Sequence, residues 1–425
     1  MQSDERDYFT DHSVLKDPYQ YLEDLYSKCP VHQLKNDESI VFVTGFEESV
    51  EVLRNTKDFS SLIAPLGAAV PLPFEPKGDD ISEQIESHRD QFPTSNLLVA
   101  YDGSTHSASR SLLTRLFVPS RLKANEAFMR QIADKMVTEV VANGKCELIN
   151  EIATPYATLV IADLLGVPEH DRELFKQVID AGPPPGNMDA KDRPHEPGPL
   201  AYMAGFFARY VQERRAAPRE DILTELALAT FPDGSTPDLM EVVRLATFLF
   251  GAGQDTSAKL LANAMRFIVE SPELQQQLRA DRELIPAFIE EVLRLEGSTK
   301  ATFRLARRNT KIGDKEIPAG KKVVVALAAA NRDPRRWKDP KHFQLDREKI
   351  KEHLAFGRGA HTCVGAPLAR AEVRVILDRF FEHTSHIGLS EEMHGPPDDR
   401  KFDYEASFII RGLAKLYLDL RPPQS

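Results

Sequence analysis

Hydrophobic residues recur at helical spacing along most of the chain. Apolar side chains three and four positions apart predict amphipathic helices, and they run through residues 122–142, 151–166, 236–270, 283–296 and 364–382. Pro367 stands near the start of the last segment, where proline is favoured because its missing N–H is not needed there. This pattern predicts a protein dominated by helices.

Strand-like runs are short and lie early and late in the chain. The run "SIVFVTG" covers residues 39–45, and β-branched runs with Pro-Ala-Gly punctuation cover residues 315–330 and 407–420. A long helical block separates the two groups, so we expect a mainly α (α+β) fold with small segregated sheets. We predict that residues 1–425 form a single domain.

Two stretches break the periodic pattern. Residues 63–93 are rich in proline and acidic residues, and residues 182–199 read "GPPPGNMDAKDRPHEPGP". The second could be a linker between domains, but the helical segments on either side look too short to be independent domains. We therefore predict a mobile lid at 182–199.

Charge and composition narrow the class of protein. The chain of 425 residues carries a net charge of −11, which argues against nucleic acid as a main partner. No apolar run reaches about 18 residues and the first thirty residues are charged throughout, so we expect neither a signal peptide nor a membrane anchor. Cys29, Cys146 and Cys363 are too few and too scattered for a disulfide framework. We expect a soluble, cytoplasmic monomer, with Cys29 and Cys146 as small buried hydrophobes.

The stretch "FGRGAHTCVG", residues 356–365, raises the first chemical question. It places three glycines around Cys363 although each ordered glycine costs about 0.5–1 kcal/mol relative to alanine. No second cysteine or histidine pair has zinc-ligand spacing, and no protease-like base accompanies the thiol. The loop runs directly into a predicted helix, whose N-terminus favours a thiolate. A thiolate in a glycine-rich loop that a flat ligand can approach suggests haem.

Polar residues interrupt the longest predicted helix at "FLFGAGQDT", residues 248–256. Gly251 and Gly253 together cost up to about 2 kcal/mol within a helix, and Asp255 and Thr256 follow in an apolar setting. One interpretation is close helix packing at the glycines with a solvated Asp255. The other is a local bulge that makes room for a small ligand beside a proton-relay pair. Neither this stretch nor "GRGAHT" completes a dinucleotide fingerprint.

Two further charged pairs stand at helical spacing. Glu291 and Arg294 lie three residues apart, and Glu290 is an equally eligible partner of Arg294 at four residues, so spacing leaves both open. His106 and Arg110 lie four apart in "DGSTHSASR" and would suit a carboxylate ligand. Taken singly, either pair is more often a solvated surface feature.

Together and in this order, the four motifs resemble the cytochrome P-450 superfamily of haem-thiolate monooxygenases, over nearly the whole chain. The resemblance implies haem b as cofactor, with Cys363 as the iron ligand, Phe356 shielding the sulfur, and Gly357 in the same loop. It implies that Ala252 to Thr256 form the oxygen-binding groove, with Asp255 and Thr256 as the catalytic proton relay. It selects Glu291 over Glu290 as partner of Arg294 and adds Arg347 as the third member of a structural clamp. His106, Arg110, Arg304 and His361 fall where the family places its haem-propionate partners.

The resemblance also implies a reaction and partners. It predicts activation of dioxygen and hydroxylation of a C–H bond in an apolar small molecule, for which we favour a steroid or terpenoid over an aromatic hydrocarbon or fatty acid. A haem-binding sensor and a non-oxygenase haem-thiolate enzyme are the alternatives. By family register the substrate pocket should be lined by Leu97, Leu98, Phe248, Leu249, Ala301, Thr302, Phe303, Phe408 and Ile409.

Electrons should come from outside, because the haem module leaves no residues for a flavin or nicotinamide domain. The chain looks like bacterial members served by an iron–sulfur ferredoxin and its NAD(P)H-dependent reductase. Lys349, Lys351, Arg358 and the "RRWK" of residues 335–338 could present a basic patch to an acidic ferredoxin. Scattered, solvated cations are the alternative interpretation.

Overall fold

Helices make up most of the structure, a computed structural model that describes residues 6–113, 116–180 and 199–423. The predicted lid at 182–199 lies outside the described residues except for Pro199. The α-helices are α1 (His12–Lys16), α2 (Tyr19–Lys28), α3 (Phe46–Arg54), α4 (Ser82–Ser87), α5 (Gly103–Ser111), α6 (Pro119–Asn143), α7 (Thr154–Leu164), α8 (Glu169–Asp180), α9 (Pro199–Ala216), α10 (Ile222–Ala227), α11 (Leu239–Glu270), α12 (Pro272–Ala280), α13 (Ile285–Glu296), α14 (Leu327–Ala330), α15 (Ala366–His383) and α16 (Glu391–His394).

The long helices begin and end where the sequence provides the appropriate signals. Asp238 caps α11 by accepting a hydrogen bond from the Glu241 N–H, and Pro119 occupies the first turn of α6. Gly144 ends α6 at a φ of 71°, a left-handed conformation that favours glycine. The helices predicted over 122–142, 236–270, 283–296 and 364–382 are therefore confirmed as α6, α11, α13 and α15.

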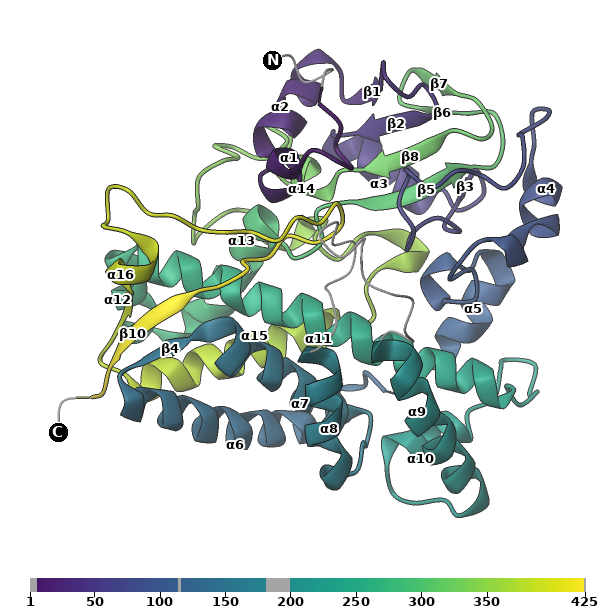
Figure 1. The fold of residues 1–425 in the computed structure, drawn as a ribbon. Helices are drawn as coiled ribbons and strands as arrows, with labels where there is room; N and C mark the ends of the chain where they lie inside the picture. Colours follow the sequence, from purple (N-terminus) through teal and green to yellow (C-terminus); the bar gives the residue numbers. More distant parts are fainter. Residues whose placement is uncertain (1–5, 114–115, 181–198, 424–425) are drawn as a thin grey trace.

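The described strands form three small, separate sheets, as the mainly α (α+β) prediction required (Figure 1). A five-stranded sheet has the order β1-β2-β8-β5-β3, a three-stranded sheet the order β4-β10-β9, and β6 pairs with β7. The strands are β1 (Val31–Gln33), β2 (Ile40–Val43), β3 (Phe59–Ser60), β4 (Lys145–Glu147), β5 (Thr302–Ala306), β6 (Thr310–Ile312), β7 (Lys315–Ile317), β8 (Lys322–Val325), β9 (His386–Leu389) and β10 (Tyr417–Arg421).

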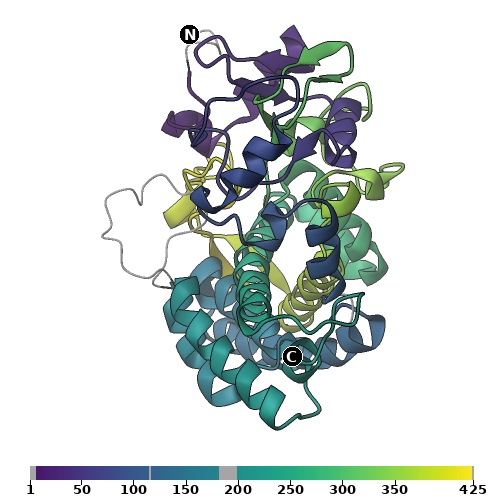
Figure 2. The same ribbon diagram turned by 90° about the vertical axis from the view of Figure 1, so that its right-hand side faces the viewer.

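The two faces of the five-stranded sheet contribute side chains to two separate apolar clusters. In β2, Ile40 and Phe42 join an aromatic cluster with the N-terminal segment, whereas Val41 and Val43 join the cluster on the other face. β2 pairs in parallel with β8 from Ile40↔Lys322 to Val43↔Val325. The largest apolar cluster lies among α6, α7, α11, α13 and α15, and Figure 2 shows α11 and α15 next to each other, seen nearly end on.

Some sequence predictions fail in detail. The run after β8 was expected to continue as strand, but Leu327–Ala330 form the short helix α14, since alanine has a high helix propensity. Residues 407–416 contribute only isolated bridges, such as Thr299↔Ile410, and the regular strand β10 begins at Tyr417. Cys146 is buried as expected, whereas Cys29 is exposed at the end of α2.

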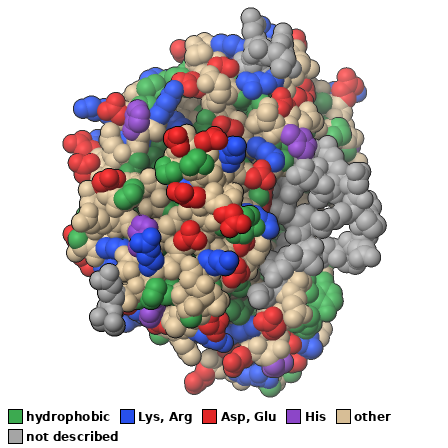
Figure 3. All heavy atoms as spheres, turned by 60° about the vertical axis from the view of Figure 1, so that its left-hand side comes forward, with side chains coloured by type: hydrophobic (Ala, Val, Ile, Leu, Met, Phe, Trp, Pro, Cys, Tyr) green, Lys and Arg blue, Asp and Glu red, His purple; other side chains and the backbone are tan. Residues whose placement is uncertain are grey.

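The surface seen in Figure 3 mixes acidic and basic side chains, with hydrophobic side chains in small groups. The net charge of −11 is therefore not gathered into one acidic region on that face. None of the described helices combines the length and the apolar character needed to cross a bilayer.

Candidate functional site

Cys363 stands at the end of a tightly folded loop that leads into α15. Its backbone N–H donates to the Phe356 carbonyl over 2.9 Å. Gly359 has a φ of 75°, and a Cβ there would come within 2.6 Å of the Leu53 carbonyl oxygen at the end of α3. This glycine is therefore required by the protein's own backbone packing rather than by a flat ligand, while Gly357, with a φ of 68°, permits the turn.

Opposing effects act on the Cys363 thiol. Burial among protein atoms raises its pKa, while the N–H groups of Gly365 and Ala366 and the charge of Arg110 lower it. The start of α15 lowers the pKa of Cys363 as predicted, but the effect of burial is larger and the net pKa is raised. The sulfur nevertheless opens onto an internal cavity and is accessible from it.

That cavity has a volume of about 310 Å³ and lies between α11, α15, α5, β5 and the cysteine loop. Its polar and chemically reactive lining residues are His106, Arg110, Thr256, Ser257, Ser298, Thr299, Thr302, Arg304, Arg358, His361, Thr362, Cys363 and Glu372. Its apolar lining includes Leu98, Val99, Phe248, Leu249, Ala252, Phe356 and Leu368. Thus segments that lie more than 250 residues apart in the sequence meet at one site.

The α11 wall holds the predicted proton-relay pair on a regular helix. Thr256 lines the cavity, and its hydroxyl donates to the Ala252 carbonyl over 2.8 Å. Asp255 is not part of the lining; its Oδ2 is buried with no hydrogen-bond partner among the described residues, and burial raises its pKa. The helix has no bulge, and Gly253 instead packs closely on α7, where a Cβ would lie 3.4 Å from Ile161.

Four basic side chains gather on the wall formed by α5, β5 and the cysteine loop: His106, Arg110, Arg304 and His361. The rings of His106 and His361 lie 3.9 Å apart. Burial lowers the pKa of Arg304 to about 10, although the charge of Asp102 opposes this shift. Burial also lowers the pKa of His361 to about 2, and the neighbouring Arg304, His106 and Arg110 add to that effect. Such a cluster needs anionic ligands to offset its cost.

This wall fits the two carboxylates of haem b. His106 Nε2 is buried in the wall with no hydrogen-bond partner among the described residues, and Arg110 uses one of its nitrogens on the Thr362 carbonyl. A free thiol stands on the same cavity, and within residues 6–113, 116–180 and 199–423 no group of three His, Cys, Asp or Glu could hold a metal ion by itself. The donors thus suit an iron carried by a macrocycle, with Cys363 as protein ligand.

The clamp behind the site has the predicted members. Arg294 donates to both carboxylate oxygens of Glu291 over 2.7 and 2.8 Å, and Arg347 Nε lies 2.9 and 3.0 Å from the same oxygens. Glu291 and Arg294 are fully buried. Glu290, the alternative partner left open by spacing, is bonded instead by Arg370 and His353.

Only part of the predicted substrate pocket reaches the cavity. Leu98, Phe248, Leu249 and Thr302 line it, whereas Leu97, Ala301, Phe303, Phe408 and Ile409 are not among the described lining residues. The period of two along β5 explains part of this, because Thr302 and Arg304 face the cavity and Phe303 faces the other side. There the rings of Phe303 and Phe408 lie 6.0 Å apart in the N-terminal aromatic cluster.

Glu372 and Ser257 are site residues that the sequence analysis missed. Both line the cavity, and the Ser257 hydroxyl donates to the Glu372 carboxyl group. Burial raises the pKa of Glu372 to about 8. The available signal was that Glu372 stands between two mostly apolar stretches of α15, "APLA" and "VRVIL". It lies on the face of α15 that packs towards α11.

Comparison with known proteins agrees with this site. The sequence model described as "Cytochrome P450" matches residues 200–403. Cytochrome P450 144 of Mycobacterium tuberculosis is 33% identical over 385 residues, covering 89% of this chain and 85% of that protein. The monooxygenase PikC of Streptomyces venezuelae is 32% identical over 381 residues, covering 88% and 85%. The substrate-free structure of Mycobacterium marinum CYP150A6 superposes with a TM-score of 0.92 at 47% identity, covering 99% of this chain and 100% of that one.

The chain therefore belongs to the cytochrome P450 family of haem-thiolate monooxygenases. Haem b is its cofactor, and the resemblance inferred from the sequence motifs is confirmed.

Proposed function

We propose that the protein hydroxylates a C–H bond of an apolar small molecule, with a steroid or terpenoid skeleton as the favoured substrate class. The cavity carries the proposal, because one wall presents Leu98, Val99, Phe248 and Leu249 close to Thr256. A largely hydrocarbon ligand fits such a surface. Structural relatives support the choice: Bacillus megaterium CYP109E1, 25% identical with a TM-score of 0.78, was solved in complex with corticosterone.

The roles of the cofactor-holding residues follow from their positions. Cys363 would hold the iron, with Phe356 at the start of the same loop, and His106, Arg110, Arg304 and His361 would bind the propionates. When bound, haem b supplies dioxygen binding and the electron transfer that cleaves the O–O bond. The protein must then orient the substrate, exclude water and deliver protons.

Proton delivery is assigned to the α11 wall. Asp255 retains a proton more readily than an exposed aspartate because its pKa is raised, and it lies 3.8 Å from Lys259, which pairs with Glu405. Thr256 stands next to Asp255 and faces the cavity. A side-chain rotation of Thr256 away from the Ala252 carbonyl would turn its hydroxyl into the cavity, where it could donate a proton to a bound reactant.

The test combines a binding screen with isotope labelling. Steroids, terpenoids, fatty acids and aromatic hydrocarbons are titrated into the ferric protein, and a low-to-high-spin change identifies ligands that expel water from the iron. The best ligand is then incubated with reduced nicotinamide, ferredoxin, reductase and labelled dioxygen. We expect a hydroxylated product that carries one labelled oxygen atom. Spin-state shifts without product would support a sensor, and shifts confined to fatty acids would overturn the substrate class.

The electron donor is proposed to be an acidic ferredoxin that docks near the cysteine loop. Lys338, Lys349 and Lys351 are exposed there, whereas Arg335 pairs with Glu48 and Arg336 with Glu352. Arg358 is only partly exposed and contributes to the cavity lining. The patch is therefore smaller than the sequence suggested, with three lysines as its outward charges.

Charge reversal tests this docking surface. The double variant Lys349→Glu/Lys351→Glu should weaken ferredoxin binding at least tenfold at low salt, with the difference shrinking as salt screens the charges. Lys145→Glu in β4 is the matched control, because it reverses an exposed lysine in the three-stranded sheet and not near the cysteine loop. Equal effects of the two variants would move the docking surface elsewhere.

A further inference from the structure

Asp102 occupies an unusual position next to the propionate wall. It is the residue before α5, yet its side chain does not cap that helix. Its carboxylate instead accepts hydrogen bonds from the Ser60 hydroxyl at 2.5 Å, the Ser61 N–H at 2.8 Å and Arg307 at 2.8 Å. Only 7% of the side chain is exposed. The Asp102 carboxylate therefore bonds to β3, to Ser61 and to Arg307 and leaves the N-terminus of α5 uncapped.

The contacts of Asp102 lead directly to the cofactor site. It fixes the backbone of Ser61, whose hydroxyl lies 3.0 Å from His361 Nε2. The His361 ring in turn contacts the His106 ring, tilted by 38° with ring centres 3.9 Å apart, and His106 Nε2 has no partner among the described residues. Two hydrogen bonds therefore connect the Asp102 carboxylate with the histidine pair that faces the propionates.

Asp102 also supplies negative charge where the wall is strongly basic. Its charge raises the pKa of Arg304 and of His106 against the effect of burial. Arg307 and Arg89 also contact it, at 2.8 and 3.4 Å. The carboxylate thus interacts both with two arginines that are not among the described lining residues of the cavity and with the basic wall that lines it.

We propose that Asp102 is a positioning residue for the haem. It orients His361 through Ser61, and its fixed negative charge lowers the reduction potential of the iron by stabilising the more positive, ferric state. The proposal rests on the assignment of His106, Arg110, Arg304 and His361 to the propionates. It does not depend on the substrate class, so the binding screen above can fail without affecting it.

The test is the reduction potential of the haem-loaded Asp102→Asn protein. The amide preserves the shape and can still accept from the Ser61 N–H, but the charge is gone. We expect a normal haem content, a thiolate-type carbon monoxide spectrum, and a ferric–ferrous equilibrium shifted about tenfold towards ferrous. That shift is 59 mV more positive for a one-electron couple.

Asp80→Asn is the matched control, because Asp80 pairs with Arg308, the neighbour of Arg307, but is 48% exposed. Water screens that charge, so its loss should leave the potential unchanged. If the ferric–ferrous equilibrium constant of Asp102→Asn stays within twofold of the wild-type value, the electrostatic role is overturned. Equal shifts of the reduction potential in Asp102→Asn and Asp80→Asn would overturn it as well.

Ser61→Ala tests the orienting role separately and keeps the proposal testable if Asp102→Asn does not fold. It removes the hydroxyl contact with His361 and retains the carboxylate. We expect haem transfer to apomyoglobin to become at least threefold faster, with the potential close to that of the wild type. An unchanged transfer rate would remove Ser61 as the link between Asp102 and the haem.

Discussion

Replacing Glu291 with glutamine is expected to destabilise the protein by about 4 kcal/mol. The Glu291 carboxylate accepts two bonds from Arg294, lies within 3.0 Å of Arg347 Nε, and also accepts from the Gln344 N–H. A glutamine amide would turn N–H groups towards one of these donors and leave two buried guanidinium groups without an anion. Breaking a buried ion pair in this way costs about 3–5 kcal/mol. Burial already lowers the pKa of Arg294 despite Glu291.

Guanidinium unfolding followed by tryptophan fluorescence measures this loss. Trp337 is the chain's single tryptophan, is buried, and has the Arg294 guanidinium 5.6 Å from its ring centre. In thermal melts, about 2.1 cal/mol/K per residue over 425 residues gives roughly 0.9 kcal/mol per degree. The expected decrease in Tm is therefore about 4 °C.

Glu283→Gln serves as the control, since this exposed residue precedes the same helix and its replacement should change stability by less than about 0.5 kcal/mol. A loss below about 1 kcal/mol for Glu291→Gln would place the clamp among ordinary surface ion pairs and refute the reasoning.

Four other variants give simpler predictions. Cys363→Ala should lose the thiolate-type carbon monoxide spectrum; its retention would place the iron ligand elsewhere. Thr256→Ala should bind substrate normally but release more hydrogen peroxide per nicotinamide consumed, and unchanged coupling would exclude Thr256 from proton delivery. Burial lowers the pKa of Lys300 to about 7, so the unfolded chain binds the extra proton between pH 7 and about 10.5 and the free energy of unfolding rises over that range; Lys300→Met should lack this rise, as denaturation at several pH values will show. The pKa of Glu372 is raised to about 8, so the folded protein holds the extra proton between pH 4.5 and 8 and stability falls as pH rises; Glu372→Gln should flatten this slope, and an unchanged slope would contradict the assignment.

Local sequence signals predicted several parts of the site that lie within one segment. The loop around Cys363 and the start of α15 are readable over fewer than twenty residues, whereas spacing left Glu290 and Glu291 equally eligible as partners of Arg294 and only the family resemblance selected Glu291. The helical periodicity of α6, α11 and α15 was equally local. These predictions hold because hydrogen bonds and capping between near neighbours determine such features.

The missed parts depend on contacts between distant segments. The bulge interpretation of α11 failed because the helix runs without interruption from Leu239 to Glu270. Gly253 instead lies beside Ile161 of α7, a contact that no spacing rule contains. Phe408 was placed in the substrate pocket, but it packs against Phe9 from the N-terminus, with ring centres 5.7 Å apart. Glu372 was passed over because its burial against Ser257 arises only when α11 and α15 come together.

Helix α13 explains how one element organises three separate regions around the site. Successive residues of a helix point about 100° apart, so the neighbours Glu290 and Glu291 face different partners. Glu291 binds Arg294 and Arg347. Glu290, whose pKa is lowered to about 2 by His353 and Arg370 despite burial, joins both sides of the cysteine loop.

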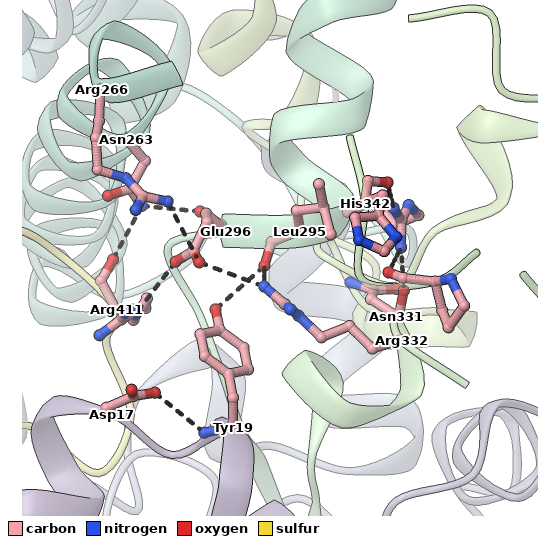
Figure 4. A network of polar contacts seen from close by, with 12 residues as sticks. Asp17, Tyr19, Asn263, Arg266, Leu295, Glu296, Asn331, Arg332, His342 and Arg411 are labelled. Carbon is pink, nitrogen blue, oxygen red and sulfur yellow. Dashed lines mark hydrogen bonds and ion pairs between the residues drawn. The ribbon is translucent and has the colours of Figure 1, made fainter. Parts of the chain in front are cut away.

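Glu296, at the end of α13, extends the same principle to the N-terminal segment. It accepts from Arg411 at 3.0 Å and Arg332 at 3.3 Å and lies 3.5 Å from Arg266, as Figure 4 shows. Arg411 also donates to the Lys16 carbonyl at the end of α1. Each glutamate thus offsets the desolvation of arginines from other segments. Removing any one of them would leave several buried cations without an anion, which costs more than the loss of one hydrogen bond. Of the three glutamates, Glu290 contacts the residues that flank the cysteine loop, while Glu291 and Glu296 fix the segments around it from the same helix, outside the cavity.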